Sequence, residues 1–388
     1  MTPATNTTAV YHRAKPKLLL IADTFYPQVD GTLKFMEEFT KRTHAKFRTS
    51  LLVPNFGVEQ GHHITYLDLS NRLKLSSYYS IQPSLTNVRK IKEQIKDNDL
   101  VFVQGPGLAG LLGMYYGHKY DKKTVFYVHI IVWELLDKYF PKPFKKILAW
   151  LLKKVSIFLY NRCDEVLVPY HGLKQQLEEY GVTSPISVAR LGVDIEKFSP
   201  TKDKRMAKMK LGLEPDKFVI GYVGRVSKEK NVSVLLEAFN RLKRRRNVFL
   251  LIVGDGPEKQ VAQFKEIRNC HVTGFVNNVE EYLQAMDLFV MPSLTETTSL
   301  ATLEAMSTGL PVIATKVGYI KSYIVKDHNG LFFARNSPGM LTVKIDQLIR
   351  DKGKREFLGQ NARKTITYSF SWERSINRII RLLEKQME

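Results

Sequence analysis

Residues 288–315 read LFVMPSLTETTSLATLEAMSTGLPVIAT, and this stretch decides the kind of fold that the chain adopts. An apolar run (288–291) is followed by a polar turn, an apolar helical stretch (299–308) and a second apolar run (311–314). Gly309 suits the C-cap of a helix, and Pro311 prevents the helix from continuing. The pattern therefore predicts a strand, a helix and a second strand, which is the repeating unit of a parallel α/β sheet.

Two glutamates of this stretch are candidate ligand-binding residues. Glu296 follows the first strand and comes directly before Thr297, Thr298 and Ser299, while Glu304 lies within the helix. A carboxylate at the carboxyl end of a strand, beside the free N–H groups of a helix N-terminus, suits an anionic ligand that carries hydroxyl groups.

The stretch resembles the donor site of the family 4 retaining glycosyltransferases of the GT-B type, whose mark is two glutamates separated by seven residues. The resemblance implies that Glu296 hydrogen-bonds the donor sugar and that Glu304 holds the ribose hydroxyls. It also implies donor contacts from the residues that begin the helix, Thr298, Ser299 and Leu300. The residues around the glutamates that are in register with the family pattern are Leu303, Ala305, Met306, Gly309, Pro311 and Val312.

Length and composition bound the possible functions. The chain has 388 residues, which suits two domains of about 150 to 200 residues each. Its net charge of +21 favours polyanionic partners: nucleic acid, an anionic membrane surface or a phosphate-bearing substrate. Cys163 and Cys270 are the only cysteines, which excludes a disulfide scaffold and fits a reducing compartment. No run approaches the roughly 18 to 20 apolar residues of a spanning helix.

Apolar runs and helical stretches alternate from Lys17 onward, stop at a polar, Lys-rich segment, and then resume. The predicted fold is α/β of the GT-B type, with two Rossmann-like, doubly wound domains facing a cleft. By resemblance, the last helix crosses back to the first domain. The expected parts are a disordered lead-in (1–16), a first domain (17–198), a linker (199–210), a second domain (211–365) and the crossing helix (366–388). The expected strands are 18–22, 50–53, 100–103, 125–128, 166–168 and 186–189, and then 218–223, 248–253, 288–291 and 311–314.

A basic loop, GYVGRVSKEKN (221–231), follows the first strand of the second half. Gly224 allows a tight turn, and Arg225 and Lys230 are placed to stabilise the negative charge of a departing diphosphate. The resemblance assigns them this role and implies that no divalent metal is required. A solvated basic loop in a basic protein is the structural alternative.

Two further turns of the second half are candidate nucleotide contacts. Gly254 begins a glycine-containing turn after the strand 248–253, where the absence of a side chain permits close approach. By resemblance, the base is read near TGFVNN (273–278), which includes Phe275 and Val276. Main-chain reading leaves UDP- and GDP-linked donors both open.

In the first half, DTFYPQVDGTLKFM (23–36) resembles the opening loop of the family, with Gly31 near the donor phosphate. Asp30 is either an N-cap of the following helix or an acceptor contact. His129 ends a strand, and the resemblance places it beside the donor sugar and acceptor; a satisfied polar side chain is the alternative. Trp133 and Tyr170 are candidate acceptor-side residues. The motif GVDIEKF (192–198) is expected to have a structural role.

The chain departs from the family at two places. Relatives commonly carry Glu-Gly-Phe-Gly where this chain has Glu296, Thr297, Thr298 and Ser299, which predicts a narrower and more polar sugar pocket. Tyr319 stands where a second glycine is frequent, and we expect its ring to lie against the sugar.

An amphipathic helix is expected at 144–161, with an apolar stripe and several lysines (Lys-rich part 142–154). The family packs this helix against the sheet, which favours burial of the stripe (Phe144, Ile147, Leu148, Leu151, Leu152, Val155, Phe158 and Leu159). Contact with an anionic membrane through Trp150 and the lysines is the alternative.

The interpretation is a retaining hexosyltransferase, cytoplasmic and peripheral on the inner face of the cell membrane. It moves a sugar from a nucleotide diphosphate sugar to a lipid or lipid-linked acceptor, and it needs no cofactor. A sugar-nucleotide epimerase of the same fold is the second interpretation. A nucleic-acid-binding protein on an inactive scaffold is the third, but the basic cluster 241–246 has no recognition motif beside it, so no specific nucleic acid is expected.

Overall fold

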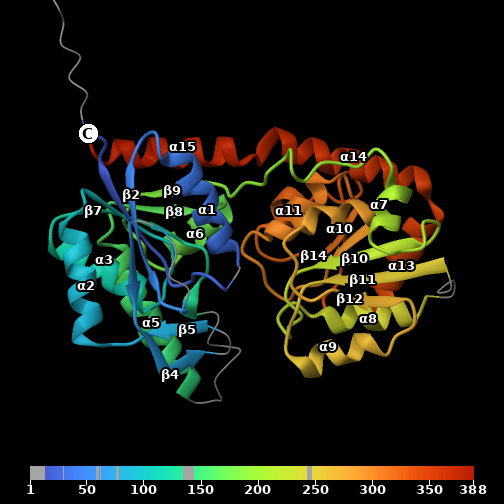
Figure 1. Ribbon diagram of the computed structural model, residues 1–388, viewed down its shortest axis with the longest axis horizontal. Coiled ribbons are helices and arrows are strands. Elements are labelled where there is room, and N and C mark those ends of the chain that lie inside the picture. Colours follow the sequence, from blue (N-terminus) through green and yellow to red (C-terminus); the bar gives the residue numbers. More distant parts are fainter. Residues whose placement is uncertain are drawn as a thin grey trace, which may run out of the picture. The chain divides into compact units, whose positions relative to one another are not determined.

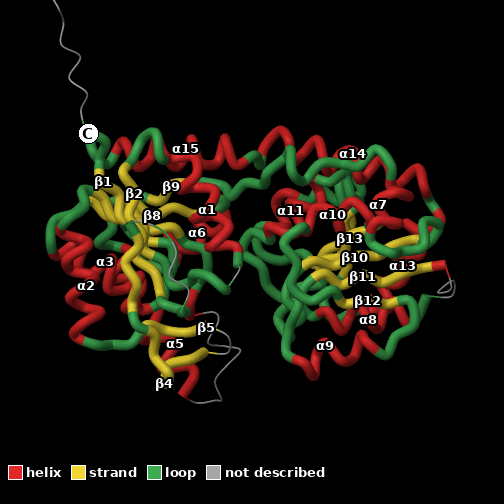
Figure 2. The backbone as a smooth tube through the Cα atoms, viewed as in Figure 1, coloured by secondary structure: helices red, strands yellow, loops and turns green. Residues whose placement is uncertain are grey.

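The computed structural model describes residues 14–28, 30–57, 61, 63–75, 78–133, 144–242 and 247–388. The chain forms two compact units. The first contains the residues through Leu167, together with Leu177–Ser187 and Leu382–Glu388, and the second contains Val168–Gln176 and Val188–Arg381. Each unit has its own sheet surrounded by helices (Figure 2).

The first unit is built on a seven-stranded sheet with the order β3-β2-β1-β6-β7-β8-β9. The pairs from β3 to β8 are parallel. The elements of this part of the chain are β1 (Lys17–Ile21), α1 (Gly31–Thr43), β2 (Arg48–Pro54), β3 (Ile64–Leu67), β4 (Leu69–Leu75), β5 (Tyr78–Ile81), α2 (Leu85–Lys96), β6 (Leu100–Val103), α3 (Leu108–Lys119), β7 (Lys123–Tyr127), α5 (Phe144–Tyr160), β8 (Glu165–Val168), α6 (His171–Glu179) and β9 (Ile186–Val188).

The central strands of this sheet are apolar along nearly their whole length because helices cover both faces of a parallel sheet. The strands β1, β6 and β7 read KLLLI, LVFV and KTVFY, and their apolar residues are buried. The helices α2 and α3 pack side by side over one face (Figure 1). The carboxyl ends of these parallel strands therefore lie along one edge, where the loops that carry candidate residues begin.

Three strands of this unit were not expected from the sequence. The strand β3 extends the edge of the sheet, and β4 and β5 form a separate antiparallel pair. The sequence LSNRLKL of β4 mixes polar and apolar residues and contains no apolar run. Edge strands and isolated hairpins do not need two buried faces, so their sequences lack the signal that identifies central strands.

The second unit is built on a six-stranded, fully parallel sheet with the order β12-β11-β10-β13-β14-β15. In Figure 1, α8 and α9 lie below this sheet, and α10 and α11 lie above it. The elements are α7 (Lys204–Lys210), β10 (Phe218–Val223), α8 (Val232–Asn240), β11 (Val248–Val253), α9 (Glu258–Lys265), β12 (Cys270–Val272), α10 (Val279–Ala285), β13 (Leu288–Met291), α11 (Leu300–Ser307), β14 (Val312–Thr315), α12 (Ile320–Tyr323), β15 (Leu331–Phe333), α13 (Pro338–Arg350), α14 (Lys352–Ser369) and α15 (Trp372–Lys385).

Two parallel α/β sheets, one in each half of the chain, confirm the predicted fold class. The end of the last helix belongs to the first unit, where Glu384 forms an ion pair with Lys46 at 3.1 Å. The segment 199–210, expected to be a linker, contains the helix α7. Its Lys208 is buried, and the charge of its ammonium group is compensated by the carboxylate of Asp287 at 2.7 Å.

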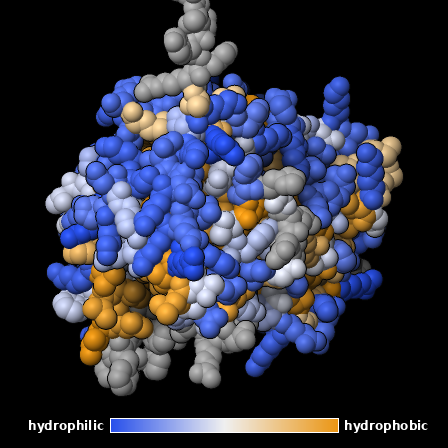
Figure 3. All heavy atoms as spheres, turned by 60° about the vertical axis from the view of Figure 1, so that its left-hand side comes forward, coloured by the Kyte–Doolittle hydropathy of each residue, from blue (hydrophilic) through white to orange (hydrophobic). Residues whose placement is uncertain are grey.

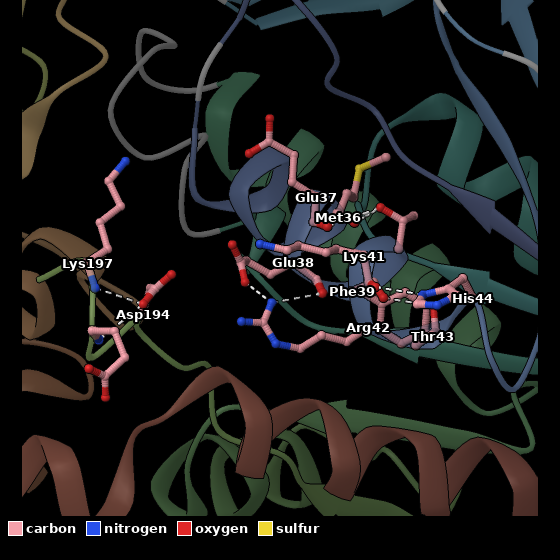
Figure 4. Close-up of polar contacts among 12 residues, drawn as sticks. Met36, Glu37, Glu38, Phe39, Lys41, Arg42, Thr43, His44, Asp194 and Lys197 are labelled. Atoms are coloured by element: carbon pink, nitrogen blue, oxygen red, sulfur yellow. Dashed lines mark hydrogen bonds and ion pairs between the residues drawn. The ribbon is translucent and has the colours of Figure 1, made fainter.

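The motif at 192–198 is a structural turn. The carboxylate of Asp194 accepts the backbone N–H groups of Glu196 at 3.2 Å and Lys197 at 3.0 Å (Figure 4). A Cβ atom on Gly192 would lie 2.6 Å from the backbone of Trp372, so this position requires glycine. Within the first unit, Figure 4 also shows the charged face of α1, where Arg42 pairs with Glu38 one turn earlier.

Candidate functional site

The strands β10 and β13 are neighbours in the second sheet, and this adjacency brings two predicted site residues together. Lys230 lies in the loop after β10, and Glu296 lies in the loop after β13. The ammonium nitrogen of Lys230 is 2.7 Å from Oε1 of Glu296, with the two side chains 24% and 7% exposed. A mostly buried charge pair thus stands at the carboxyl edge of the sheet, where α/β folds bind ligands.

The backbone of both loops holds this pair in place. The hydroxyl of Ser293 donates to the same Oε1 atom of Glu296 at 2.7 Å. The N–H of Leu294 donates to the carbonyl oxygen of Glu229 at 2.8 Å, which joins the two loops directly. A charge-assisted hydrogen bond between fixed partners is stronger than one between neutral groups. The carboxylate is therefore oriented before any ligand arrives.

Glycines let the loops after β10 and β11 come close together. Gly224 and Gly254 have φ values of +142° and +139°, a region that favours glycine. A Cβ atom on Gly254 would lie 2.1 Å from the carbonyl oxygen of Gly224. The side chain of Arg225 is exposed at this edge, and its carbonyl oxygen accepts the hydroxyl of Tyr222 at 2.8 Å.

The turn after β12 lies next to the turn after β11. An isolated bridge joins Gly274 to Gly254, and Phe275 and Val276 follow directly. The ring of Phe275 is exposed. The predicted base-reading segment is therefore positioned beside the predicted glycine turn.

The residues that begin α11 form a tightly constrained loop. Ser299 is the N-cap and has a φ of +63°, a left-handed conformation that costs free energy for a residue other than glycine. Thr298 is buried, and its hydroxyl has no hydrogen-bond partner among the described residues. Leu300 begins the helix, and Glu304 is buried one turn later.

Residues that were not predicted from the sequence also shape this loop. A Cβ atom on Gly318 would lie 1.6 Å from the carbonyl oxygen of Glu296, and the hydroxyl of Tyr323 donates to the carbonyl oxygen of Thr298 at 2.9 Å. Ser293 carried no site prediction, since serine after a strand is common in turns. Nothing in the local sequence marks Gly318 or Tyr323 as contacts of residues about 20 positions earlier.

In the first unit, His129 lies just beyond β7 and is buried. Its Nε2 atom is 2.9 Å from Oε1 of Gln104, and its ring stacks on Tyr127 with centroids 4.5 Å apart. Burial lowers the pKa of His129 to about 3. The imidazole is therefore neutral near pH 7, where it orients or exchanges hydrogen bonds without carrying a charge.

Asp30 has the capping role that the sequence suggested. Its carboxylate accepts the N–H groups of Thr32 and Leu33, each at 2.9 Å, at the start of α1. Gly31 is the first residue of this helix. Burial raises the pKa of Asp30.

Trp133 and Tyr170 are both buried against other rings. Trp133 meets Tyr180 edge to face, with ring centroids 5.6 Å apart. Tyr170 belongs to the second unit, where its ring stacks on that of Tyr319 with centroids 4.8 Å apart. The expectation for Tyr319 was a ring against the sugar; the structure instead encloses the ring in this stack.

Asp23 is a site feature that the sequence analysis did not single out. Its carboxylate accepts the N–H groups of Gly107 at 2.8 Å and Ala109 at 3.1 Å, at the start of α3. Cβ atoms on Gly105 and Gly107 would each lie 2.5 Å from this side chain. Burial raises the pKa of Asp23 to about 6. The sequence signal that could have identified Asp23 is its position as a polar residue just after a predicted strand.

The helix α5 buries only part of the apolar stripe that was expected to be buried. Ile147, Leu151, Val155 and Phe158, spaced three or four positions apart, are exposed, and so is Trp150 at 60%. The buried residues of the helix include Ser156, Leu159 and Tyr160. Lys146 and Lys154 are exposed on the same helix. Leu159 is buried and Leu148 and Leu152 are half-buried, so the prediction of burial is wrong only for Ile147, Leu151, Val155 and Phe158.

We refer to Ile147, Trp150, Leu151, Val155 and Phe158 as the α5 surface. Figure 3 shows hydrophobic side chains gathered on the lower part of one face of the molecule. Such patches in soluble folds commonly mark an interaction site. Within the described ranges, no helix has the length and hydropathy required to cross a bilayer. Residues 142–143 and most of the basic cluster 241–246 lie outside the described residues.

Two family models match the chain and together account for most of it. Residues 29–197 match the model described as Glycosyltransferase Family 4, and residues 203–365 match Glycosyl transferases group 1. The sulfoquinovosyl transferase SQD2 of Arabidopsis thaliana is 31% identical over 60% of this chain and 47% of its own length. The alpha-monoglucosyldiacylglycerol synthase of Acholeplasma laidlawii is 28% identical over 67% of this chain and 68% of its own length. The chain thus spans about half to two-thirds of these relatives.

A solved structure has the same architecture over nearly the whole chain. Anabaena HepE in complex with UDP-glucose superposes with a TM-score of 0.78, covering 95% of this chain and 99% of that one. The sequence identity of 19% means that this likeness establishes the fold alone.

Proposed function

Because the chain belongs to the family 4, group 1 glycosyltransferases and has the GT-B fold, we propose that it transfers a hexose from a nucleotide diphosphate sugar to an acceptor hydroxyl with retention of configuration. The observation that carries this proposal is the Lys230–Glu296 pair at the carboxyl edge of β10 and β13. It joins one residue assigned to the diphosphate to one assigned to the sugar.

The chemistry follows from the charges at this edge. As the bond between the anomeric carbon and the diphosphate oxygen breaks, negative charge grows on the diphosphate, and Lys230 and Arg225 stabilise it. The acceptor oxygen forms its bond to the same carbon and the same face of the sugar. Its proton passes to the departing phosphate oxygen. Glu296 holds sugar hydroxyls, and Glu304 holds the ribose.

The donor is proposed to be UDP- or GDP-linked. HepE, which shares the fold, was solved with UDP-glucose. In this chain, the exposed ring of Phe275 and the backbone around Gly274 are the groups available to the base. The buried hydroxyl of Thr298, where relatives carry an aromatic residue, favours a sugar that offers a hydrogen bond at that point.

The acceptor is proposed to be a lipid or a lipid-linked sugar. One relative is named for the synthesis of monoglucosyldiacylglycerol. The α5 surface supports the same class because its exposed apolar side chains, interspersed with lysines, fit the headgroup region of an anionic bilayer. The net charge of +21 acts in the same direction. We therefore propose a cytoplasmic protein bound peripherally to the inner face of the cell membrane.

The test is incubation of the protein with a panel of nucleotide sugars and a membrane lipid extract, with products identified by mass. The expected result is one sugar added to one lipid class, and loss of product in Glu296→Ala and Lys230→Ala variants that remain folded. Unchanged turnover in both variants would exclude the assignment. Conversion of a sugar nucleotide without any acceptor would instead identify an epimerase.

A further inference from the structure

The loop from Glu296 to Ser299 contains a conformation that its own sequence does not favour. Ser299 adopts a φ of +63° and a ψ of +77°, where a side chain is strained and glycine is not. Such a residue persists when the surrounding structure over-determines it. Contacts from outside the loop hold this conformation.

The support comes from α12 (Ile320–Tyr323) and its N-cap, Tyr319. The N–H of Tyr319 donates to the carbonyl oxygen of Thr297 at 2.9 Å. The hydroxyl of Tyr323 donates to the carbonyl oxygen of Thr298 at 2.9 Å. Two successive carbonyl groups next to Glu296 are thus fixed by two tyrosines of one short segment.

Tyr319 is itself held by other aromatic rings. Its ring lies parallel to that of Tyr170, with centroids 4.8 Å apart and 7° between the planes. Tyr323 and Phe370 surround the same ring at centroid distances of 5.4 and 6.0 Å. Only 5% of Tyr319 is exposed. The residue that completes this enclosure, Tyr170, comes from the segment after β8, almost 150 positions earlier in the chain.

We propose that Tyr170 and Tyr319 are positioning residues that hold the Glu296–Ser299 loop in its donor-binding conformation. The ring stack with Tyr170 fixes the position of Tyr319. The N–H of Tyr319 donates a hydrogen bond to the carbonyl oxygen of Thr297, which is the residue after Glu296. The segment that follows β8 is thereby coupled to the donor carboxylate. This inference rests on the proposed function for the role of Glu296, but the structural coupling itself does not depend on it.

Hydrogen–deuterium exchange tests the coupling without requiring activity. Tyr170→Leu keeps apolar volume but removes the stack, and it is expected to raise the exchange rate of the Tyr319 amide and of the amides at 297–303. Tyr170→Phe keeps the ring and is expected to exchange as the wild-type protein does. Tyr368→Ala, at an exposed tyrosine of the same unit, is the matched control and should leave these amides unchanged. Equal exchange in Tyr170→Leu and the wild type would overturn the proposal.

Kinetics then separate positioning from general destabilisation. Tyr170→Leu is expected to raise the KM for the nucleotide sugar about threefold to tenfold, the size of one lost aromatic contact, with a smaller change in kcat. Glycine adopts the left-handed conformation of residue 299 without strain, so Ser299→Gly should make the loop less dependent on the tyrosine contacts. The double variant Tyr170→Leu/Ser299→Gly should therefore recover most of the wild-type KM. Additive effects of the two changes would overturn the route through Ser299. If the wild-type protein transfers no sugar, the proposed function fails while the exchange result still decides the coupling.

Discussion

Lys230 and Glu296 lie 66 positions apart in the chain, and their side chains meet at 2.7 Å. Resemblance assigned Lys230 to the diphosphate and Glu296 to the sugar, two different parts of one donor. Their direct contact means that each group fixes the other in position. Under the proposed function, a donor would bind an already ordered pair of charges, so less side-chain entropy would be lost on binding.

Replacing Lys230 with methionine should destabilise the protein as well as abolish donor binding. The variant leaves the carboxylate of Glu296, 7% exposed, with the hydroxyl of Ser293 and without a cation. We expect the free energy of unfolding to fall by about 1 to 3 kcal/mol. Urea denaturation measures this change.

The double variant Lys230→Met/Glu296→Gln should be more stable than Lys230→Met alone because the uncompensated charge is gone. Arg350→Met is the matched control, since Arg350 pairs with Asp346 at 2.6 Å on an exposed face. Its effect should stay within about 0.5 kcal/mol. If the losses in free energy of unfolding of Lys230→Met and Glu296→Gln add up to the loss in the double variant, the two side chains are not coupled.

Gly318→Ala should displace the Glu296–Ser299 loop. The added Cβ atom would lie 1.6 Å from the carbonyl oxygen of Glu296, so the backbone of one of the two segments must move. We expect loss of most transferase activity with a folded protein. Gly212→Ala is the control because Gly212 also has a positive φ, of +70°, and has no atom within 4 Å of the added Cβ. If both variants keep equal activity, the contact does not position Glu296.

The pH dependence of stability should contain two opposing contributions from the first unit. The pKa of His129 is lowered from 6.5 to about 3, so the unfolded chain binds more protons between these values and stability falls as the pH drops below 6.5. The pKa of Asp23 is raised from 3.8 to about 6, so the folded chain binds more protons in that window and stability rises as the pH drops. Between pH 4 and 6 the two contributions nearly cancel.

Single variants should separate these contributions. Asp23→Asn removes the opposing contribution, and its stability relative to the wild type should fall by up to about 1.4 kcal/mol for each pH unit from 6 to 4. His129→Gln should show the reverse trend. Urea denaturation at half-unit steps of pH measures both, and pH profiles parallel to that of the wild type would contradict the buried, neutral state of His129.

The α5 surface should bind anionic vesicles, and the fluorescence of Trp150 can report this binding. Trp150 is exposed, while the two other tryptophans, Trp133 and Trp372, are buried. Entry into the headgroup region should therefore shift the emission of Trp150 to shorter wavelength. Ile147→Ser/Leu151→Ser should weaken binding at least tenfold, because burial of each large aliphatic side chain contributes about 1.5 to 3 kcal/mol.

Leu85→Ser is the matched control for this experiment because Leu85 is equally apolar and 90% exposed, on a different helix of the same unit. It should bind vesicles as the wild-type protein does. Vesicles of zwitterionic lipid should bind more weakly, since each lysine near an anionic surface contributes about 1 kcal/mol. Equal binding by all variants would exclude α5 as the contact surface.

The central strands, the helices between them and the candidate donor residues Glu296 and Lys230 could all be predicted from the amino-acid sequence. These features depend on local patterns: apolar runs for strands buried on both faces, and short motifs at strand ends. The edge strands β3 and β12 were missed because their sequences, ITYL and CHV, contain polar residues, and β15, which reads LFF, is too short to show a strand periodicity.

The contacts between these residues could be learned only from the folded chain. The Lys230–Glu296 pair requires β10 and β13 to be neighbours. The order of strands in a sheet cannot be predicted from the sequence of any single segment. The fit of Gly318 against Glu296 and the stack of Tyr170 on Tyr319 likewise join distant segments. The exposure of the α5 stripe depends on what packs against it, because an apolar stripe shows which side is apolar but not whether a neighbour covers it. The lowered pKa of His129 has the same origin, since burial is a property of the surrounding fold.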